Sequence, residues 1–175
     1  MNTAFVEIRV RRPEKLAALA RFVERLSEAK DSANFPTDAE WKAYFDSSSL
    51  AYFENLSPEE LKEWEAEWKA TPVERRLRDL SLWPHWDFGS FLDALKNGEF
   101  LVSTLDVTAS PLKLVFEPLA FPYGGADCLI AATEAFGQEV IGVDDGTGYR
   151  PYVKLPRWQP KSRRGQDNQD AGPHS

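Results

Sequence analysis

The chain is poor in cysteine and histidine, with Cys128 as its single thiol and two imidazoles among 175 residues. One cysteine excludes an intramolecular disulfide framework and a zinc site built from several thiolates. A catalytic Cys-His pair would need His85 to lie against Cys128, because His174 falls in a C-terminal stretch without apolar periodicity. A buried thiol without a catalytic role is the simpler interpretation.

Long hydrophobic runs and an excess of positive charge are also absent. No stretch approaches the run of about 18 apolar residues that marks a transmembrane helix, and the first residues, MNTAFVEIRVRRPEK, lack a signal-peptide core. These absences predict a cytoplasmic protein that does not enter the membrane. The formal net charge of −7 argues against a nucleic-acid partner, because phosphate binding requires a basic face.

Length and composition predict one domain followed by a tail. With 175 residues, of which 42% are hydrophobic, the chain can bury a full core but is short for two typical domains. The last stretch, QPKSRRGQDNQDAGPHS, has no apolar periodicity. We therefore predict a single domain over residues 1–158 and a disordered tail over residues 159–175.

Residues 5–10 alternate between apolar and polar side chains and are predicted as a strand, and apolar residues at helical spacing then predict a helix from Pro13 to about residue 28. A helical block follows. Its helix starts are predicted by capping boxes, in which a hydroxyl residue precedes a glutamate by three positions. Three pairs fit this pattern: Thr37 with Glu40, Ser57 with Glu60, and Thr71 with Glu74. Asp87 is the expected N-cap of one more helix, over residues 87–96.

The second half of the sequence predicts strands again. Residues 100–107 and 112–117 read as a hairpin, and a helix between Gly125 and Gly137 leads into a strand over residues 138–143. Residues 152–155 are expected to form a short edge strand, because prolines flank them on both sides.

These elements predict an α+β fold. Without the helical block, their order is βαββαβ, which is the split βαβ arrangement of ferredoxin-like domains. We therefore expect a ferredoxin-like sheet layer with an acidic, Trp-rich helical insertion at residues 34–97, after the first helix. A looser α+β layer is the alternative, and neither fold decides the function.

One candidate site lies at the start of the 125–137 helix. Helix N-terminal amides can hold an anion, and the following strand ends in two aspartates that could form a carboxylate site. The simpler interpretations are a tight turn, a buried thiol and a solvated Asp-Gly turn. No Walker motif, complete G-x-G-x-x-G motif or EF-hand spacing is present, so we predict no metal, cofactor or catalytic residue, and leave enzymatic activity open. The ligand-binding candidates are Gly124, Gly125, Asp127, Cys128, Asp144 and Asp145.

The helical block carries the second candidate site. Residues 31–67 contain ten acids and two bases, so their net charge of −8 exceeds in magnitude that of the whole chain. Five of the six tryptophans lie in or just after this segment. Aromatic anchors bordered by charge are typical of protein interfaces, although a helical layer with tryptophans in its core has the same composition. The partner-binding candidates are Glu59, Glu60, Glu63, Trp64, Glu67 and Trp68.

A small acidic α+β chain with a Trp-rich acidic face and no catalytic set resembles the immunity proteins of bacterial toxin systems. The resemblance implies a non-enzymatic inhibitor that presents carboxylates to the basic cleft of a cognate toxin. The FPYGG and DDGTGY segments also resemble those of bacterial proteins without an assigned function. The main expectation is therefore an immunity-type partner of a basic protein. The alternatives are a small-molecule or anion-binding domain or enzyme at the glycine and aspartate site, and a structural adaptor.

Overall fold

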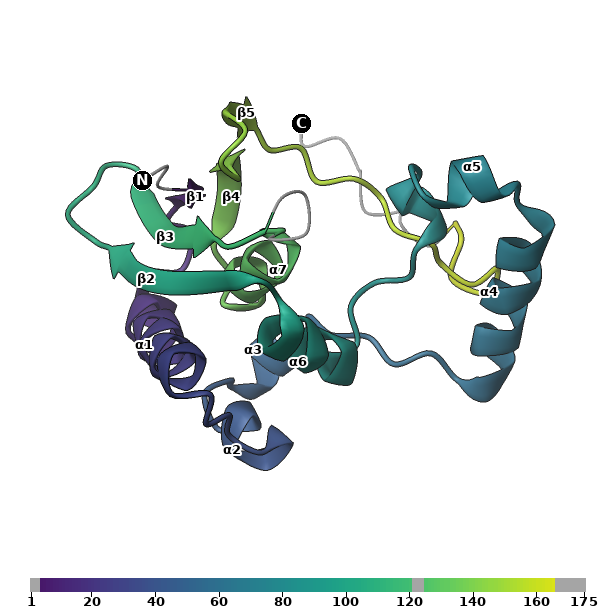
Figure 1. Cartoon of the computed structure of the whole chain (residues 1–175). Helices are drawn as coiled ribbons and strands as arrows, with labels where there is room; N and C mark the ends of the chain where they lie inside the picture. Colours follow the sequence, from purple (N-terminus) through teal and green to yellow (C-terminus); the bar gives the residue numbers. More distant parts are fainter. Residues whose placement is uncertain (1–3, 121–124, 166–175) are drawn as a thin grey trace, which may run out of the picture. The chain divides into compact units, whose positions relative to one another are not determined.

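The computed structural model describes residues 4–120 and 125–165 (Figure 1). Its contacts divide the chain into two compact units. Unit 1 comprises residues 1–53 and 86–153, and unit 2 comprises residues 54–85 and 154–175. The chain leaves unit 1 after Phe53, returns at Trp86 and leaves it again after Val153. The single domain expected over residues 1–158 stays a prediction.

Unit 1 is built on an antiparallel five-stranded sheet in the order β2-β3-β1-β4-β5 (Figure 1). The mixture of this sheet with helices confirms the predicted α+β class. The hairpin of β2 and β3 is also confirmed, whereas the short edge strand lies before the predicted residues 152–155. The strands are β1 Ala4–Arg9, β2 Phe100–Asp106, β3 Leu112–Pro118, β4 Glu139–Asp144 and β5 Tyr149–Pro151.

Helices of unit 1 pack against one face of this sheet. Along β1, Ala4, Val6 and Ile8 are fully buried while the side chains between them are only partly buried, which is the period of a sheet covered on one side. The same core contains Leu19 and Phe22 of α1 and most of α7. The helices are α1 Leu16–Ser32, α2 Asp38–Lys42, α3 Ser47–Leu50, α6 Phe88–Asn97 and α7 Asp127–Ala135, with a 3-10 turn, η1, at Pro13–Lys15.

Part of the predicted helical insertion belongs to the core of unit 1. Phe22 contacts the rings of Trp41, Phe45 and Phe91 at centroid distances of 5.4, 5.3 and 6.3 Å. Trp41 and Phe45 are buried there. The insertion is therefore divided between the two units, because these aromatic side chains complete the core around α1 and α6.

The capping boxes have different outcomes. The boxes at Thr37 and Ser57 are confirmed, with both reciprocal hydrogen bonds present in each. The third box is wrong, because Pro72 is the N-cap residue of the short helix that follows, and the Thr71 hydroxyl donates to the Glu67 carbonyl. Asp87 caps α6 as predicted, by accepting from the Ser90 amide.

Unit 2 is a small tryptophan-containing unit. The Trp64 indole donates to the Leu82 carbonyl at 2.8 Å, and the Trp83 indole donates to the Arg76 carbonyl at 3.2 Å. The Trp68 ring lies 5.5 Å from that of Trp64 and 4.7 Å from that of Trp83. Its elements are α4 Pro58–Ala70, α5 Val73–Arg76, the 3-10 turn η2 Leu80–Leu82, and a C-terminal segment, residues 154–165.

The C-terminal segment joins unit 2 through its backbone. The Trp158 amide donates to the Trp83 carbonyl at 2.9 Å, beside an isolated parallel bridge between Pro84 and Trp158. Residues 159–165, which the sequence predicted as the start of a disordered tail, form a turn that bonds to α4. The rest of that predicted tail, residues 166–175, lies outside the described residues.

In the described parts of the chain, no helix combines the length and apolar character needed to cross a membrane.

Candidate functional site

Unit 2 contains a group of glutamates that we call the carboxylate row: Glu60, Glu63 and Glu67 of α4, with Glu54 just before the helix. The spacing of three and seven residues along α4 brings its three members to one face of the helix. Ser57 fixes the start of this helix by its capping box with Glu60. The predicted partner-binding glutamates therefore do gather on one surface, except for Glu59.

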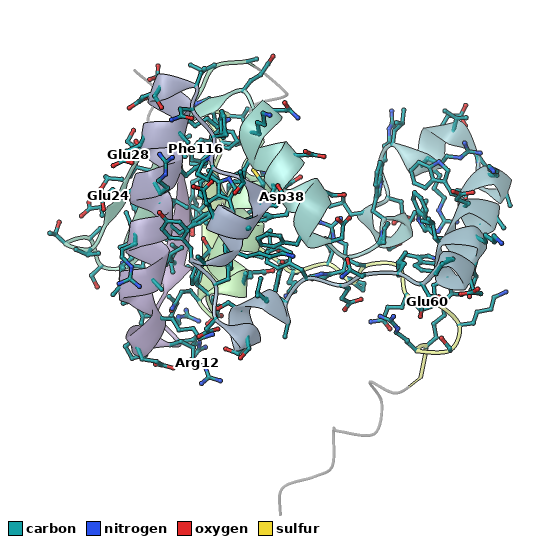
Figure 2. The ribbon with its side chains drawn as sticks, turned by 90° about the horizontal axis from the view of Figure 1, so that it is seen from below. Arg12, Glu24, Glu28, Asp38, Glu60 and Phe116 are labelled. Atoms are coloured by element: carbon teal, nitrogen blue, oxygen red, sulfur yellow. The ribbon has the colours of Figure 1, made fainter. Side chains whose placement is uncertain are left out.

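The row is occupied by a second element, the basic turn, which is residues 160–165. Amides of Arg163 and Arg164 both donate to the Pro160 carbonyl and close the turn. Arg163 bridges two carboxylates, with Nη1 at 3.2 Å from Glu54 and Nη2 at 2.9 Å from Glu60. Figure 2 shows Glu60 beside this turn.

Two further members of the row also bind the turn. Arg164 Nη2 lies 2.9 Å from each carboxylate oxygen of Glu67. The Lys161 backbone amide donates to Glu63 at 2.9 Å. All four carboxylates of the row are thus engaged by donors of the turn, and the side chains of Arg163 and Arg164 are each about two-fifths exposed.

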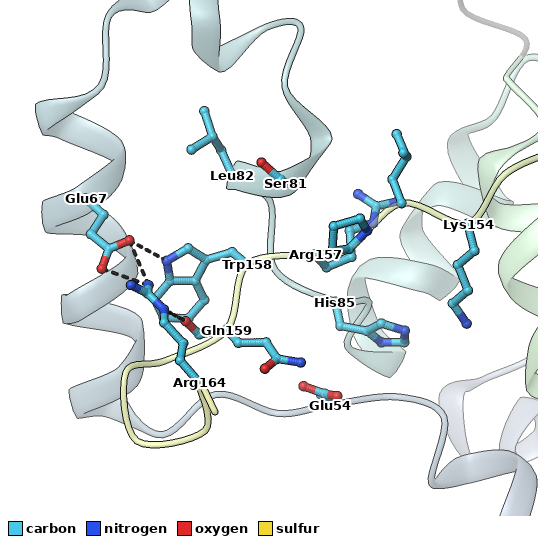
Figure 3. A pocket seen from close by; sticks show the side chains of 12 residues that line it. Glu54, Glu67, Ser81, Leu82, His85, Lys154, Arg157, Trp158, Gln159 and Arg164 are labelled. Carbon is cyan, nitrogen blue, oxygen red and sulfur yellow. Dashed lines mark hydrogen bonds and ion pairs between the residues drawn. The ribbon is translucent and has the colours of Figure 1, made fainter. Parts of the chain in front are cut away.

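Trp158 anchors the turn to α4 (Figure 3). Its side chain is 6% exposed, its indole donates to Glu67 at 2.8 Å, and the guanidinium of Arg164 lies 5.6 Å from its ring centroid. The hydrogen bond from Trp158 is the main cause that lowers the pKa of Glu67, with Arg164 adding to it against the opposing effect of burial. Glu67 is therefore held as a carboxylate between an aromatic donor and a cation.

An open groove of about 810 Å³ adjoins this contact. Glu54, Glu67, Trp158 and Arg164 are among the residues that line it. The groove brings solvent to the edge of the carboxylate row, so the ion pairs of the row are accessible from outside unit 2.

Other members of the predicted partner site lie differently. Glu59 is exposed and forms no ion pair with any residue that the structure describes. Trp64 and Trp68 are half-buried and pack within unit 2, as the ring contacts above show. Sequence reasoning missed Trp158, Arg163, Arg164 and Glu54 as site residues. The only signal in the sequence was opposite charge: the basic stretch at residues 161–164 could pair with the acidic segment at residues 31–67.

The glycine and helix site gives no specific support for a ligand. Gly124 lies outside the described residues, and Gly125 has neither a positive φ nor any atom within 4 Å of the position of a Cβ. Asp127 is exposed at the start of α7, whereas Cys128 is buried. Burial, reinforced by the nearby Asp127 carboxylate, raises the pKa of Cys128 to about 12, so the thiol is protonated at neutral pH and is a poor nucleophile.

Asp144 and Asp145 are engaged by their own turn. Asp144 accepts hydrogen bonds from the amides of Gly146 and Gly148. Asp145 accepts from the Thr147 amide and hydroxyl and pairs with Arg150 at 2.7 Å. Partial burial acts to raise the pKa of Asp145, but these hydrogen bonds outweigh it and lower the pKa. These are the contacts of an Asx turn that the simpler interpretation predicted.

The described part of the chain has no cluster of three or more His, Cys, Asp or Glu side chains placed to hold a metal ion. Comparisons with protein-family models, curated proteins and solved structures found no match to this chain. The proposal that follows therefore rests on the site geometry alone.

Proposed function

We propose that the chain is a non-enzymatic protein-binding protein, an immunity-type inhibitor that presents the carboxylate row of α4 to a basic protein such as a toxin. One observation carries this proposal: the row already binds two arginines and an indole N–H, all from the chain's own basic turn. A surface that arranges carboxylates to fit guanidinium groups can bind those of a partner with the same geometry.

Electrostatics supports the same function. Residues 54–67, which include most of α4, carry six acids and one base, whereas the whole of unit 2 has ten acids and ten bases. The negative charge is therefore local to α4, and a local concentration of charge speeds the encounter with a cationic segment of a partner. The row is only partly shielded, since the side chains of Glu54 and Glu67 are 40% and 34% exposed. A partner's cations could therefore reach the carboxylates.

We also infer that unit 1 has the ferredoxin-like arrangement. The order β2-β3-β1-β4 of its first four strands and the βαββαβ sequence of its main elements support this inference. Unit 2 would then be the insertion that carries the binding surface, because residues 54–85 interrupt unit 1 between its first helix and second strand.

Binding of a labelled octa-arginine peptide tests the proposed function. The double variant Glu63→Gln/Glu67→Gln removes two charges of the row, and Asp144→Asn/Asp145→Asn removes two charges in unit 1 as a matched control. We expect the first variant to bind the peptide at least about five-fold more weakly than the wild type, in low salt, because two charge-assisted contacts are lost. Equal losses in both variants would reduce the binding to a net-charge effect and overturn the proposal.

A further inference from the structure

The basic turn occupies the same carboxylates that the proposed function assigns to a partner. We infer that the turn is an intramolecular competitor, and that the partner binds through a segment with two neighbouring arginines that replaces Arg163 and Arg164 on the carboxylate row. This inference rests on the proposed function and names its ligand class.

The geometry of Arg163 specifies arginine as the preferred cation. Its two terminal nitrogens reach different carboxylates, those of Glu54 and Glu60, at 3.2 and 2.9 Å. A lysine ammonium is a single point charge and cannot reproduce this fork. The neighbouring Arg164 meets Glu67 and lies over the Trp158 ring, so adjacent arginines satisfy separate parts of the row.

The turn can leave the row without loss of its anchor. Trp158 is buried and hydrogen-bonded to the Trp83 backbone, whereas Arg163 and Arg164 are partly exposed and form ion pairs with Glu60 and Glu67 of α4. Partly exposed ion pairs are weak, and the apolar surface that their release uncovers is the part of the Trp158 ring under Arg164. A cationic segment of a partner could therefore displace the two arginines while Trp158 keeps the chain in place.

Competition also sets the expected size of the effect. The apparent association constant of a partner is the intrinsic constant multiplied by the fraction of molecules in which the turn is open. The three partly exposed ion pairs of Arg163 and Arg164 close the turn by a factor of roughly 3 to 30. Loss of both arginines should therefore tighten the binding of an added arginine peptide by about that factor.

The test uses the labelled peptide QPKSRRG, the sequence of residues 159–165, and measures its binding to the whole chain by fluorescence anisotropy. The variant Arg163→Gln/Arg164→Gln opens the row. The control Arg75→Gln/Arg78→Gln removes the same charge within unit 2, from one arginine that pairs with Asp79 and one that forms no ion pair with any described residue. Thermal unfolding of each variant shows that it is folded before the affinities are compared.

We expect the Arg163/Arg164 variant to bind QPKSRRG about 3 to 30 times more tightly than the control. It should also bind QPKSKKG, in which lysines replace both arginines, at least about three-fold more weakly than QPKSRRG. Equal affinity of the variant and the control would overturn the competitor and leave the proposed function standing. Peptide binding that is unchanged by Glu63→Gln/Glu67→Gln would overturn the proposed function itself, and with it this inference.

Discussion

Unit 1 and unit 2 are stabilised in different ways. In unit 1, apolar side chains of the strands and helices, many of them aromatic, form one continuous buried core. In unit 2, α4, α5 and η2 bury no side chain completely, and Trp158 and Pro160 are the buried residues among those described. Indole hydrogen bonds to backbone carbonyls and the ion pairs of the carboxylate row connect its elements. Unit 1 should therefore depend on apolar volume, and unit 2 on its tryptophans and charges.

The largest effect should come from the core of unit 1. Phe22→Ala removes a fully buried ring that contacts five other aromatic rings. We expect the free energy of unfolding to fall by about 3 to 5 kcal/mol, because the substitution leaves a cavity. Urea denaturation measures this change. The control Leu61→Ala truncates an exposed side chain of α4 and should cost less than about 0.5 kcal/mol. Similar losses at both positions would contradict the contrast between the units.

The second effect should be confined to unit 2. Trp158→Ala removes its buried ring and the hydrogen bond to Glu67. We expect about 3 kcal/mol less protection of the amides of α4 from hydrogen exchange, near the lower limit for loss of a buried aromatic side chain. The amides of β1 and β3 should keep their protection. If protection fell equally in β1, unit 2 would not be a separate cooperative unit.

Lowering the pH should loosen the basic turn before it affects the core of unit 1. The pKa of Glu67 is lower in the folded chain than its ordinary value, so its contribution to stability is present above that ordinary value. The contribution is lost as the pH falls through the lowered pKa, when the carboxylate that Trp158 and Arg164 bind is protonated. We expect tryptophan fluorescence to change below about pH 4.3. The accompanying loss of stability should be less than about 1 kcal/mol, since Glu67 is about one-third exposed.

The variant Glu67→Gln is the matched control for this titration. Glutamine can still accept a hydrogen bond from the Trp158 indole, but it has no charge to lose. The pH-dependent fluorescence change should therefore shrink in this variant. A titration identical to that of the wild type would show that another group governs the turn.

Much of the fold could be predicted because its signals are local. Alternation along β1, the hairpin of β2 and β3, and the caps at Thr37, Ser57 and Asp87 all depend on neighbours in the sequence. The third capping box failed for a local reason as well, since Pro72 has the N-cap position and the Thr71 hydroxyl bonds back into α4.

The division into units and the complete site could not be predicted because they depend on long-range contacts. Nothing in the pattern around Trp41 distinguishes a ring that packs on Phe22 from one on an exposed face. Likewise, Arg163 and Glu60 are 103 residues apart. The charge of the acidic segment indicated that its glutamates form a binding surface. It did not indicate that a basic stretch of the same chain would bind them.

The central claim is that the carboxylate row recognises arginine, and a double-mutant cycle between Glu67 and Arg164 tests it most directly. Exchange of the Trp158 indole proton would report the opening free energy in the wild type, Glu67→Gln, Arg164→Gln and the double variant. We predict a favourable coupling of about 0.5 to 1 kcal/mol that decreases as salt is raised, as expected for a partly exposed ion pair. A coupling of zero at low salt would contradict the account.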